Sequence, residues 1–149
     1  LGFNYRMTDF QAALGMSQLR KINKFLKKRL EIAKIYNEEF EGNKFFDVQP
    51  YEDKHHSSYH LYPILLKDYY IKFRSKIFSS LKKKGLGIKV HYIPVYLQPY
   101  YKSLGYRKGA CLNAEKFYER EISIPLSPSM TKEDVKYVIN AVNGVFKKN

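Results

Sequence analysis

Apolar residues recur every three or four positions through residues 1–42, and this spacing predicts two helices. Thr8 and Gln11 have the spacing of a capping box, so we expect the first helix to begin there. Asn23 is expected to break or bend the pattern, and Gly42 to end the second, longer helix. The apolar stripe of the longer helix comprises Leu26, Leu30, Ala33, Tyr36 and Phe40.

The rest of the chain alternates between strand-like and helical patterns. Residues 44–58 are polar and irregular and are expected to form a loop. Strands are predicted at 59–66, 87–95 and 122–126, and helices at 68–84, 113–121 and 131–146. Pro63 indicates an edge position or a bulge in the first strand. The pattern predicts an α/β (α+β) domain over residues 43–149, in which helices pack on one face of a small sheet.

Composition narrows the class of protein. Hydrophobic residues make up 44% of the chain, which is typical of a globular protein. Its one cysteine, Cys111, excludes an internal disulfide and favours a reducing compartment, so we expect a cytoplasmic protein. No apolar run is long enough to cross a bilayer, and no signal-peptide pattern opens the chain. Because the chain begins with Leu1 and a polar turn, we expect it to be part of a longer protein.

The net charge of +13 raises the question of nucleic-acid binding. The lysines and arginines are spread over the faces and ends of several predicted helices, and no nucleic-acid-binding motif accompanies them. We therefore interpret them as surface charge and expect no nucleic-acid partner, with a basic RNA-binding module as the alternative. The spacing of the four histidines does not match a compact metal site, so no bound metal is expected.

The turn before the first helix carries the most distinctive polar groups. Gly2, Asn4, Tyr5 and Arg6 bring a flexible backbone, an amide, a phenol and a guanidinium together just outside a helix N-terminus. Such groups suit a phosphate or a carboxylate. The alternative is an exposed turn whose side chains bind only their own backbone.

The run from Gly2 to Gly15 closely resembles the segment that opens the C-terminal part of the DegT/DnrJ/EryC1/StrS sugar aminotransferases. Further matches follow in the family's order at residues 59–62, 87–95, 98–101, 113–115, 121–126 and 134–135. These enzymes use pyridoxal 5'-phosphate (PLP) and have the aspartate aminotransferase fold (fold type I). The motifs are most similar to members that aminate C4 of UDP-linked 4-keto-6-deoxy sugars, as in the pseudaminic acid pathway.

The resemblance implies that residues 1–42 connect two domains and that residues 43–149 are the small C-terminal domain, with a mostly antiparallel sheet. It places the large domain and the lysine that binds PLP upstream of Gly2. No catalytic residue is therefore expected in this chain, which should be inactive alone. The implied reaction transfers an amino group from glutamate to a nucleotide sugar. A 3-aminotransferase or a sugar dehydratase of the same family is the alternative.

The resemblance also implies roles for five residues. Asn4 matches the motif asparagine that reaches the PLP phosphate of the partner subunit, which implies a homodimer with shared active sites. Tyr5 and Arg6 are expected to face the cofactor or the nucleotide diphosphate, although Arg6 could instead hold the helix entrance. His91 and Tyr92 are expected to line the sugar-nucleotide pocket, with packing inside a strand as the alternative.

Overall fold

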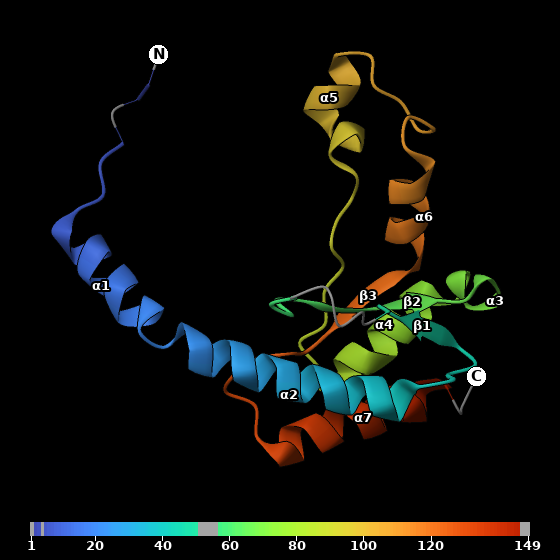
Figure 1. The fold of residues 1–149 in the computed structure, drawn as a ribbon. Coiled ribbons are helices and arrows are strands. Elements are labelled where there is room, and N and C mark those ends of the chain that lie inside the picture. Colours follow the sequence, from blue (N-terminus) through green and yellow to red (C-terminus); the bar gives the residue numbers. More distant parts are fainter. Residues whose placement is uncertain (1, 4, 51–56, 147–149) are drawn as a thin grey trace.

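The computed structural model describes residues 2–3, 5–50 and 57–146 (Figure 1). Its helices are α1 (Asp9–Leu19), α2 (Ile22–Phe40), α3 (Asp68–Ile71), α4 (Arg74–Lys83), α5 (Pro99–Ser103), α6 (Leu112–Arg120) and α7 (Lys132–Phe146), together with the short 3-10 helix η1 (Val95–Leu97). Its strands are β1 (Phe46–Val48), β2 (Tyr62–Leu66) and β3 (Glu121–Ile124). They form one antiparallel sheet in the order β1-β2-β3, so the predicted fold class is confirmed.

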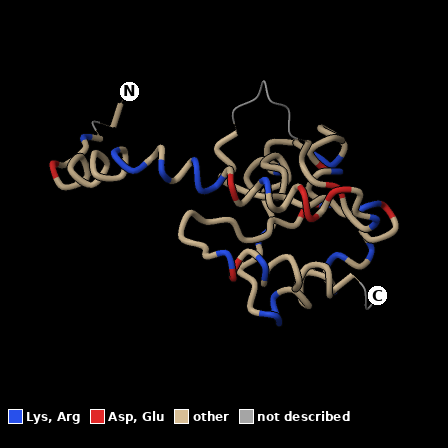
Figure 2. The backbone as a smooth tube through the Cα atoms, turned by 60° about the horizontal axis from the view of Figure 1, so that its bottom comes forward, with Lys and Arg blue, Asp and Glu red and all other residues tan. Residues whose placement is uncertain are grey.

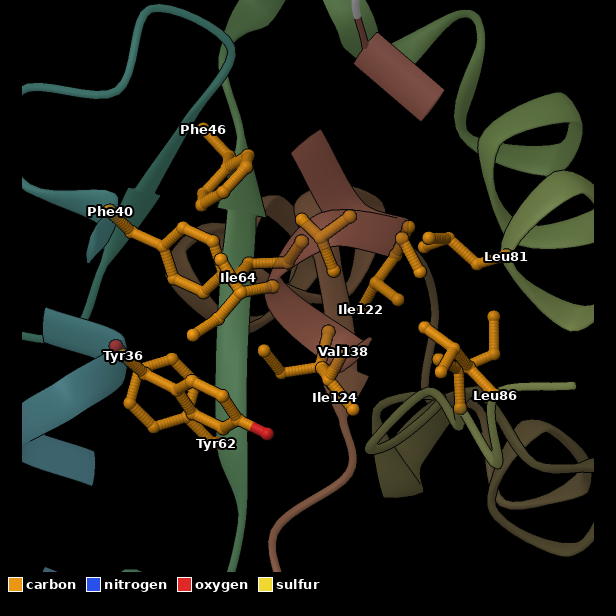
Figure 3. Packing of buried hydrophobic residues seen from close by; sticks show 14 of the residues in the cluster. Tyr36, Phe40, Phe46, Tyr62, Ile64, Leu81, Leu86, Ile122, Ile124 and Val138 are labelled. Atoms are coloured by element: carbon orange, nitrogen blue, oxygen red, sulfur yellow. The ribbon is translucent and has the colours of Figure 1, made fainter. Parts of the chain in front are cut away.

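The core lies between this sheet and the helices α2, α4 and α7. Alternate residues of β2 are buried and point to the same side, as the period of two in a strand requires. Figure 3 shows Ile64 of β2 between Phe40 of α2 and Val138 of α7. The rings of Tyr36 in α2 and Tyr62 in β2 meet edge to face, with their centroids 5.0 Å apart. Helix and sheet therefore share one continuous apolar core.

The two halves of the long helix α2 have different surroundings. Its buried residues are Ile32, Ala33, Tyr36 and Phe40, all in the C-terminal half. The Tyr36 hydroxyl donates a hydrogen bond of 2.8 Å to the carbonyl oxygen of Pro125, just after β3. This half of α2 is thus part of the sheet's core. The predicted division of the chain at residue 42 stays a prediction.

Helix α1 begins at the predicted capping box. The N–H of Thr8 donates to Oε1 of Gln11 over 2.9 Å, and the N–H of Gln11 donates to the Thr8 hydroxyl oxygen over 3.4 Å. The break between α1 and α2 lies at residues 20–21 rather than at Asn23. No residue of α1 is buried, and Figure 1 shows this helix projecting from the body of the domain.

One strand prediction and one loop prediction were wrong. The predicted strand at residues 87–95 pairs with the sheet only at an isolated bridge between Lys89 and Ser123. Beyond that bridge the Glu121 side chain accepts the N–H of His91, so a side chain replaces the backbone partner that would continue a ladder. The predicted loop at residues 44–58 contains β1, which is only three residues long and too short to show a periodic pattern.

Smaller differences have local causes. Strand β2 starts at Tyr62 rather than Tyr59, and it is the central strand rather than an edge. Its Pro63 is tolerated because β1 pairs only with residues 64–66 and ends before reaching the proline. The predicted helix at 68–84 is divided into α3 and α4, whereas α6 and α7 lie within one residue of their predicted bounds.

Candidate functional site

The segment after Gly87 leaves the sheet and is fixed to β3 by four hydrogen bonds. Lys89 and Ser123 exchange two backbone hydrogen bonds of 3.2 and 2.9 Å. The N–H of His91 donates to Oε2 of Glu121 over 2.8 Å, and the His91 Nδ1 lies 2.8 Å from the Ser123 hydroxyl oxygen. Both the backbone and the ring of His91 are therefore held against β3.

Glu121 is the centre of this network and is completely buried. Its carboxylate also accepts a hydrogen bond from the Ser123 hydroxyl. The carbonyl oxygen of Glu121 accepts from Nε of Arg74 over 3.1 Å, and the Arg74 guanidinium lies 5.1 Å from the centre of the Tyr118 ring. Both carboxylate oxygens thus have donors, as a buried carboxylate requires. The sequence signal that could have found Glu121 is a carboxylate directly before the predicted strand at 122–126; the structure makes it the first residue of β3, whose four residues are all buried.

Two pockets are lined in part by the segment that contains His91 and Tyr92. The first has a volume of about 390 Å³, and its polar lining includes His60, Lys89, His91, Tyr92 and Ser123. The second has a volume of about 350 Å³ and is lined by Arg74, Val90, Tyr92, Ile93, Gln98 and Tyr118. Tyr92 is 71% exposed and borders both. The structure therefore brings this predicted pair of residues together at a pocket, although not inside a strand.

The structure does not bring the other predicted residues to this place. Tyr5 and Arg6 lie in the exposed stretch before α1, and the Tyr5 ring stacks on that of Phe3. Figure 1 shows this stretch apart from the sheet and from α5. Asn4 lies outside the described residues. The predicted site residues thus form two separate groups in this chain.

Comparison with known proteins finds matches over nearly the whole chain. The sequence profile of the DegT/DnrJ/EryC1/StrS aminotransferase family matches residues 1–143. The chain belongs to this family. Over 148 residues it is 42% identical to the UDP-4-amino-4,6-dideoxy-N-acetyl-beta-L-altrosamine transaminase of Campylobacter jejuni subsp. jejuni serotype O:2, which covers 99% of this chain and 39% of that protein.

Solved structures of aminotransferases match the fold as well. Helicobacter pylori PseC, an aminotransferase involved in the biosynthesis of pseudoaminic acid, is 35% identical with a TM-score of 0.92. The match covers all of this chain and 40% of that one. The PLP form of the sugar aminotransferase Spr1654 from Streptococcus pneumoniae is 32% identical, with a TM-score of 0.88 over 96% of this chain and 36% of that one. The chain thus spans about two fifths of the length of these relatives.

PLP is the cofactor expected for this family, and its phosphate is the part that the stretch before α1 could contact. Thr8 and Gln11 satisfy each other in the capping box. The phenol of Tyr5 and the guanidinium of Arg6 lie just before them and are exposed. The O–H of a phenol and the N–H groups of a guanidinium are donors of the kind that bind phosphate. These two side chains therefore fit the phosphate of PLP.

A second buried carboxylate, which the sequence did not indicate, holds the loop between α5 and α6. Glu115 accepts hydrogen bonds from the Tyr96 hydroxyl over 2.7 Å and from the N–H of Gly109 over 2.6 Å. These bonds hold the pKa of Glu115 below its usual value. Desolvation and the hydrogen bond to Glu115 raise the pKa of Tyr96 to about 12. Glu115 therefore shapes the segment next to the second pocket.

Other predicted properties concern metal, membrane and nucleic acid. Within residues 2–3, 5–50 and 57–146, no group of three or more His, Cys, Asp or Glu side chains could hold a metal ion. None of the helices formed by these residues is long and apolar enough to cross a membrane. Of the histidines, His55 and His56 lie outside the described residues. Figure 2 shows Lys and Arg distributed over many parts of the chain, and the expectation of no nucleic-acid partner stays a prediction.

Proposed function

We propose that this chain is the C-terminal part of a PLP-dependent aminotransferase that transfers an amino group from glutamate to C4 of a UDP-linked 4-keto-6-deoxy sugar. The observation that carries the proposal is the 42% identity, over nearly the whole chain, to a transaminase whose name specifies a UDP-linked 4-amino-4,6-dideoxy sugar. When bound, PLP supplies the electron sink for moving the amino group. The lysine that binds it covalently lies upstream of this chain in our proposal, so the chain alone is inactive.

The stretch before α1 serves the cofactor in this proposal. Asn4 binds the PLP phosphate of the partner subunit, and Tyr5 and Arg6 face the cofactor or the nucleotide diphosphate. The exposure of Tyr5 and Arg6 immediately before a capped helix supports this role, because a ligand can reach solvent-exposed phenol and guanidinium groups. Contact across two subunits makes the active enzyme a homodimer with shared active sites.

The pocket beside β3 serves the nucleotide sugar. His91 and Tyr92 line it together with Lys89 and His60, and no carboxylate is among its lining residues. The positive charge of Lys89, with no acid beside it in this lining, suits a diphosphate. His91 and Tyr92 offer hydrogen-bonding groups at its edge for the hydroxyls of a sugar.

The reaction belongs in the cytoplasm in this proposal. Cys111 is a free, exposed thiol, which is compatible with a reducing compartment.

The function is tested on the full-length protein that carries this chain. Glutamate is expected to bleach the absorption band of lysine-bound PLP, and a UDP-linked 4-keto-6-deoxy sugar to restore it. A spectrum unchanged by glutamate would contradict the proposed amino donor. Analysis of the product then distinguishes amination at C4 from amination at C3 and from dehydration, which are the two alternatives within the family.

The role of Asn4 is tested in the same protein by Asn4→Ala. Loss of a hydrogen bond to a charged phosphate is expected to weaken PLP retention roughly 10- to 100-fold. The control is Asn113→Ala, which removes an exposed amide from α6. Equal retention of PLP in the two variants would remove Asn4 from the cofactor site.

A further inference from the structure

Counting the hydrogens of the Glu121 network fixes the protonation of one ring nitrogen of His91. Oε2 of Glu121 accepts the backbone N–H of His91, and its Oε1 accepts the Ser123 hydroxyl. A serine hydroxyl has one hydrogen, and the hydrogen of Ser123 already forms the hydrogen bond to Glu121. The 2.8 Å contact between the Ser123 oxygen and Nδ1 of His91 is therefore a hydrogen bond in which Nδ1–H donates.

A neutral histidine that carries its hydrogen on Nδ1 has a lone pair on Nε2. Among the described residues, no hydrogen bond of the network involves Nε2. The ring lines the pocket of about 390 Å³, and 10% of the side chain remains exposed there. The buried side of the ring is thus saturated with hydrogen bonds, while its other nitrogen is left to act as an acceptor.

We propose that Glu121 and Ser123 are positioning residues that hold His91 as the Nδ1–H tautomer, so that Nε2 accepts a hydrogen bond from a hydroxyl of the nucleotide sugar. The last part rests on the function proposed above. The arrangement parallels the way in which a carboxylate or carbonyl orients a histidine that works through its other nitrogen. Here the serine hydroxyl transmits the orientation from a carboxylate that solvent does not reach.

The first test reads the tautomer directly, without substrate. Two-bond ¹H–¹⁵N correlation spectra of the full-length protein, labelled with ¹⁵N-histidine, distinguish protonated from unprotonated ring nitrogens. In the unaltered protein His91 is expected to show Nδ1 protonated and Nε2 unprotonated, and its signal is assigned by its loss in His91→Gln. Protonation on Nε2 alone would overturn the proposal.

Glu121→Gln is the most informative variant, because it is expected to reverse the direction of the hydrogen bond between Ser123 and Nδ1 of His91. The amide oxygen continues to accept the N–H of His91, which places the amide NH₂ against the Ser123 hydroxyl oxygen. Ser123 then donates its hydrogen to Nδ1, and the ring is expected to change to the Nε2–H tautomer. Ser123→Ala removes the acceptor beside Nδ1 and is expected only to increase the fraction of the Nε2–H tautomer, because Oε1 of Glu121 still lies 3.8 Å from Nδ1. Ser103→Ala is the matched control, because it removes an exposed serine hydroxyl that donates to the carbonyl oxygen of Tyr100 and does not line either pocket beside His91.

The second test asks whether the orientation serves the substrate. In Glu121→Gln the KM for the nucleotide sugar is expected to rise roughly 3- to 10-fold, because a hydroxyl directed at Nε2 then meets a second hydrogen. The KM for glutamate and the retention of PLP are expected to stay unchanged, and Ser103→Ala is expected to change none of these three quantities.

The outcomes separate this inference from the proposed function. A reversed tautomer without any change in the KM for the nucleotide sugar would overturn the role of Nε2 in binding. If the unaltered protein transfers no amino group to any nucleotide sugar, the proposed function fails, while the spectra still decide whether Glu121 and Ser123 set the tautomer.

Discussion

Helix α1 and the sheet core contain similar apolar side chains in opposite surroundings. Phe10 and Leu14 of α1 are 90% and 62% exposed, and α1 buries nothing. Ile64 of β2 is completely buried among residues of α2 and α7. Because burial of apolar surface is the main stabilising contribution to a fold, the core is determined by this chain, whereas the position of α1 needs other contacts.

The two groups of candidate site residues follow the same division. His91 is fixed by hydrogen bonds to β3, so its geometry is part of the domain's own structure. Tyr5 and Arg6 are attached to α1, and α1 lies outside the core. In the proposed enzyme His91 therefore has its position before substrate binds, whereas the positions of Tyr5 and Arg6 depend on the large domain and the partner subunit.

The largest expected effect contrasts Ile64→Ala with Leu14→Ala. In the 149-residue chain, Ile64→Ala should lower the free energy of unfolding by about 2–5 kcal/mol, because it leaves a cavity in the core. Leu14→Ala should change it by no more than about 0.5 kcal/mol, because an exposed side chain loses few contacts. Urea unfolding followed by circular dichroism measures both. Equal losses would show that α1 is covered within this chain.

The same pair sharpens the comparison in the full-length protein. If the rest of the protein covers α1, Leu14→Ala is expected to cost more there than in the 149-residue chain, by about 1 kcal/mol or more. An equal, small cost in both proteins would mean that α1 is also exposed in the complete enzyme.

Periodicity and capping chemistry predicted the parts of the fold that follow local rules. The capping box of α1 and the helices α2, α6 and α7 were predicted to within a few residues, because caps and apolar stripes are encoded over short distances. The segment at 87–95 was mistaken for a strand because its apolar residues do not reveal that Glu121, thirty residues from His91, takes a backbone partner. Such long-range side-chain contacts have no local signature.

The candidate site was predicted from motif order rather than from chemistry. His91 and Tyr92 were selected by the resemblance, and the structure adds the pocket beside them. Glu121 and Ser123 were missed as site residues, since a buried carboxylate in a strand reads as packing until its partners are known. Asn4 lies outside the described residues, so its role stays a prediction.

The next effect contrasts two equivalent capping boxes. In α7 the N–H and the hydroxyl of Thr131 both donate to Asp134 over 2.9 Å, and the N–H of Asp134 donates back over 3.1 Å. Because α7 packs on the core, Thr131→Ala should lower the free energy of unfolding of the 149-residue chain by about 0.5–2 kcal/mol. Thr8→Ala should leave the unfolding midpoint unchanged and only increase amide hydrogen exchange in the first turn of α1. A loss of equal size in Thr8→Ala would contradict the view that α1 lies outside the cooperative unit.

The Asp134 box also predicts a dependence on acid. Its hydrogen bonds to Thr131 hold the pKa of Asp134 below the usual value. The folded state therefore binds the proton less readily than the unfolded state. Asp134 contributes to the free energy of unfolding above the unfolded pKa of about 3.9, and this contribution is lost as the pH falls through the folded pKa. Between pH 7 and pH 3 the stability of Asp134→Asn should fall less than that of the unaltered chain. Urea midpoints measured across this range check it, and parallel curves for the two proteins would refute it.

The smallest effect concerns Tyr96, which joins the segment after His91 to α6. The pKa of Tyr96 is raised to about 12, so its phenol stays neutral in the folded protein at pH values at which a free phenol ionises. Because the folded state raises the pKa of Tyr96, the contribution of this phenol to the free energy of unfolding is complete below pH 10 and is lost as the pH rises toward 12. The measurement is the absorbance of tyrosinate as the pH is raised. In Tyr96→Phe, one phenol fewer should ionise near pH 12 than in the unaltered chain. Tyr100→Phe, which removes an exposed phenol from α5, is the control for the loss of one tyrosine. If Tyr96→Phe and Tyr100→Phe remove the same part of the titration, Glu115 does not hold the segment between η1 and α6. That segment would then lack a fixed position in the domain, like the stretch before α1 and unlike His91.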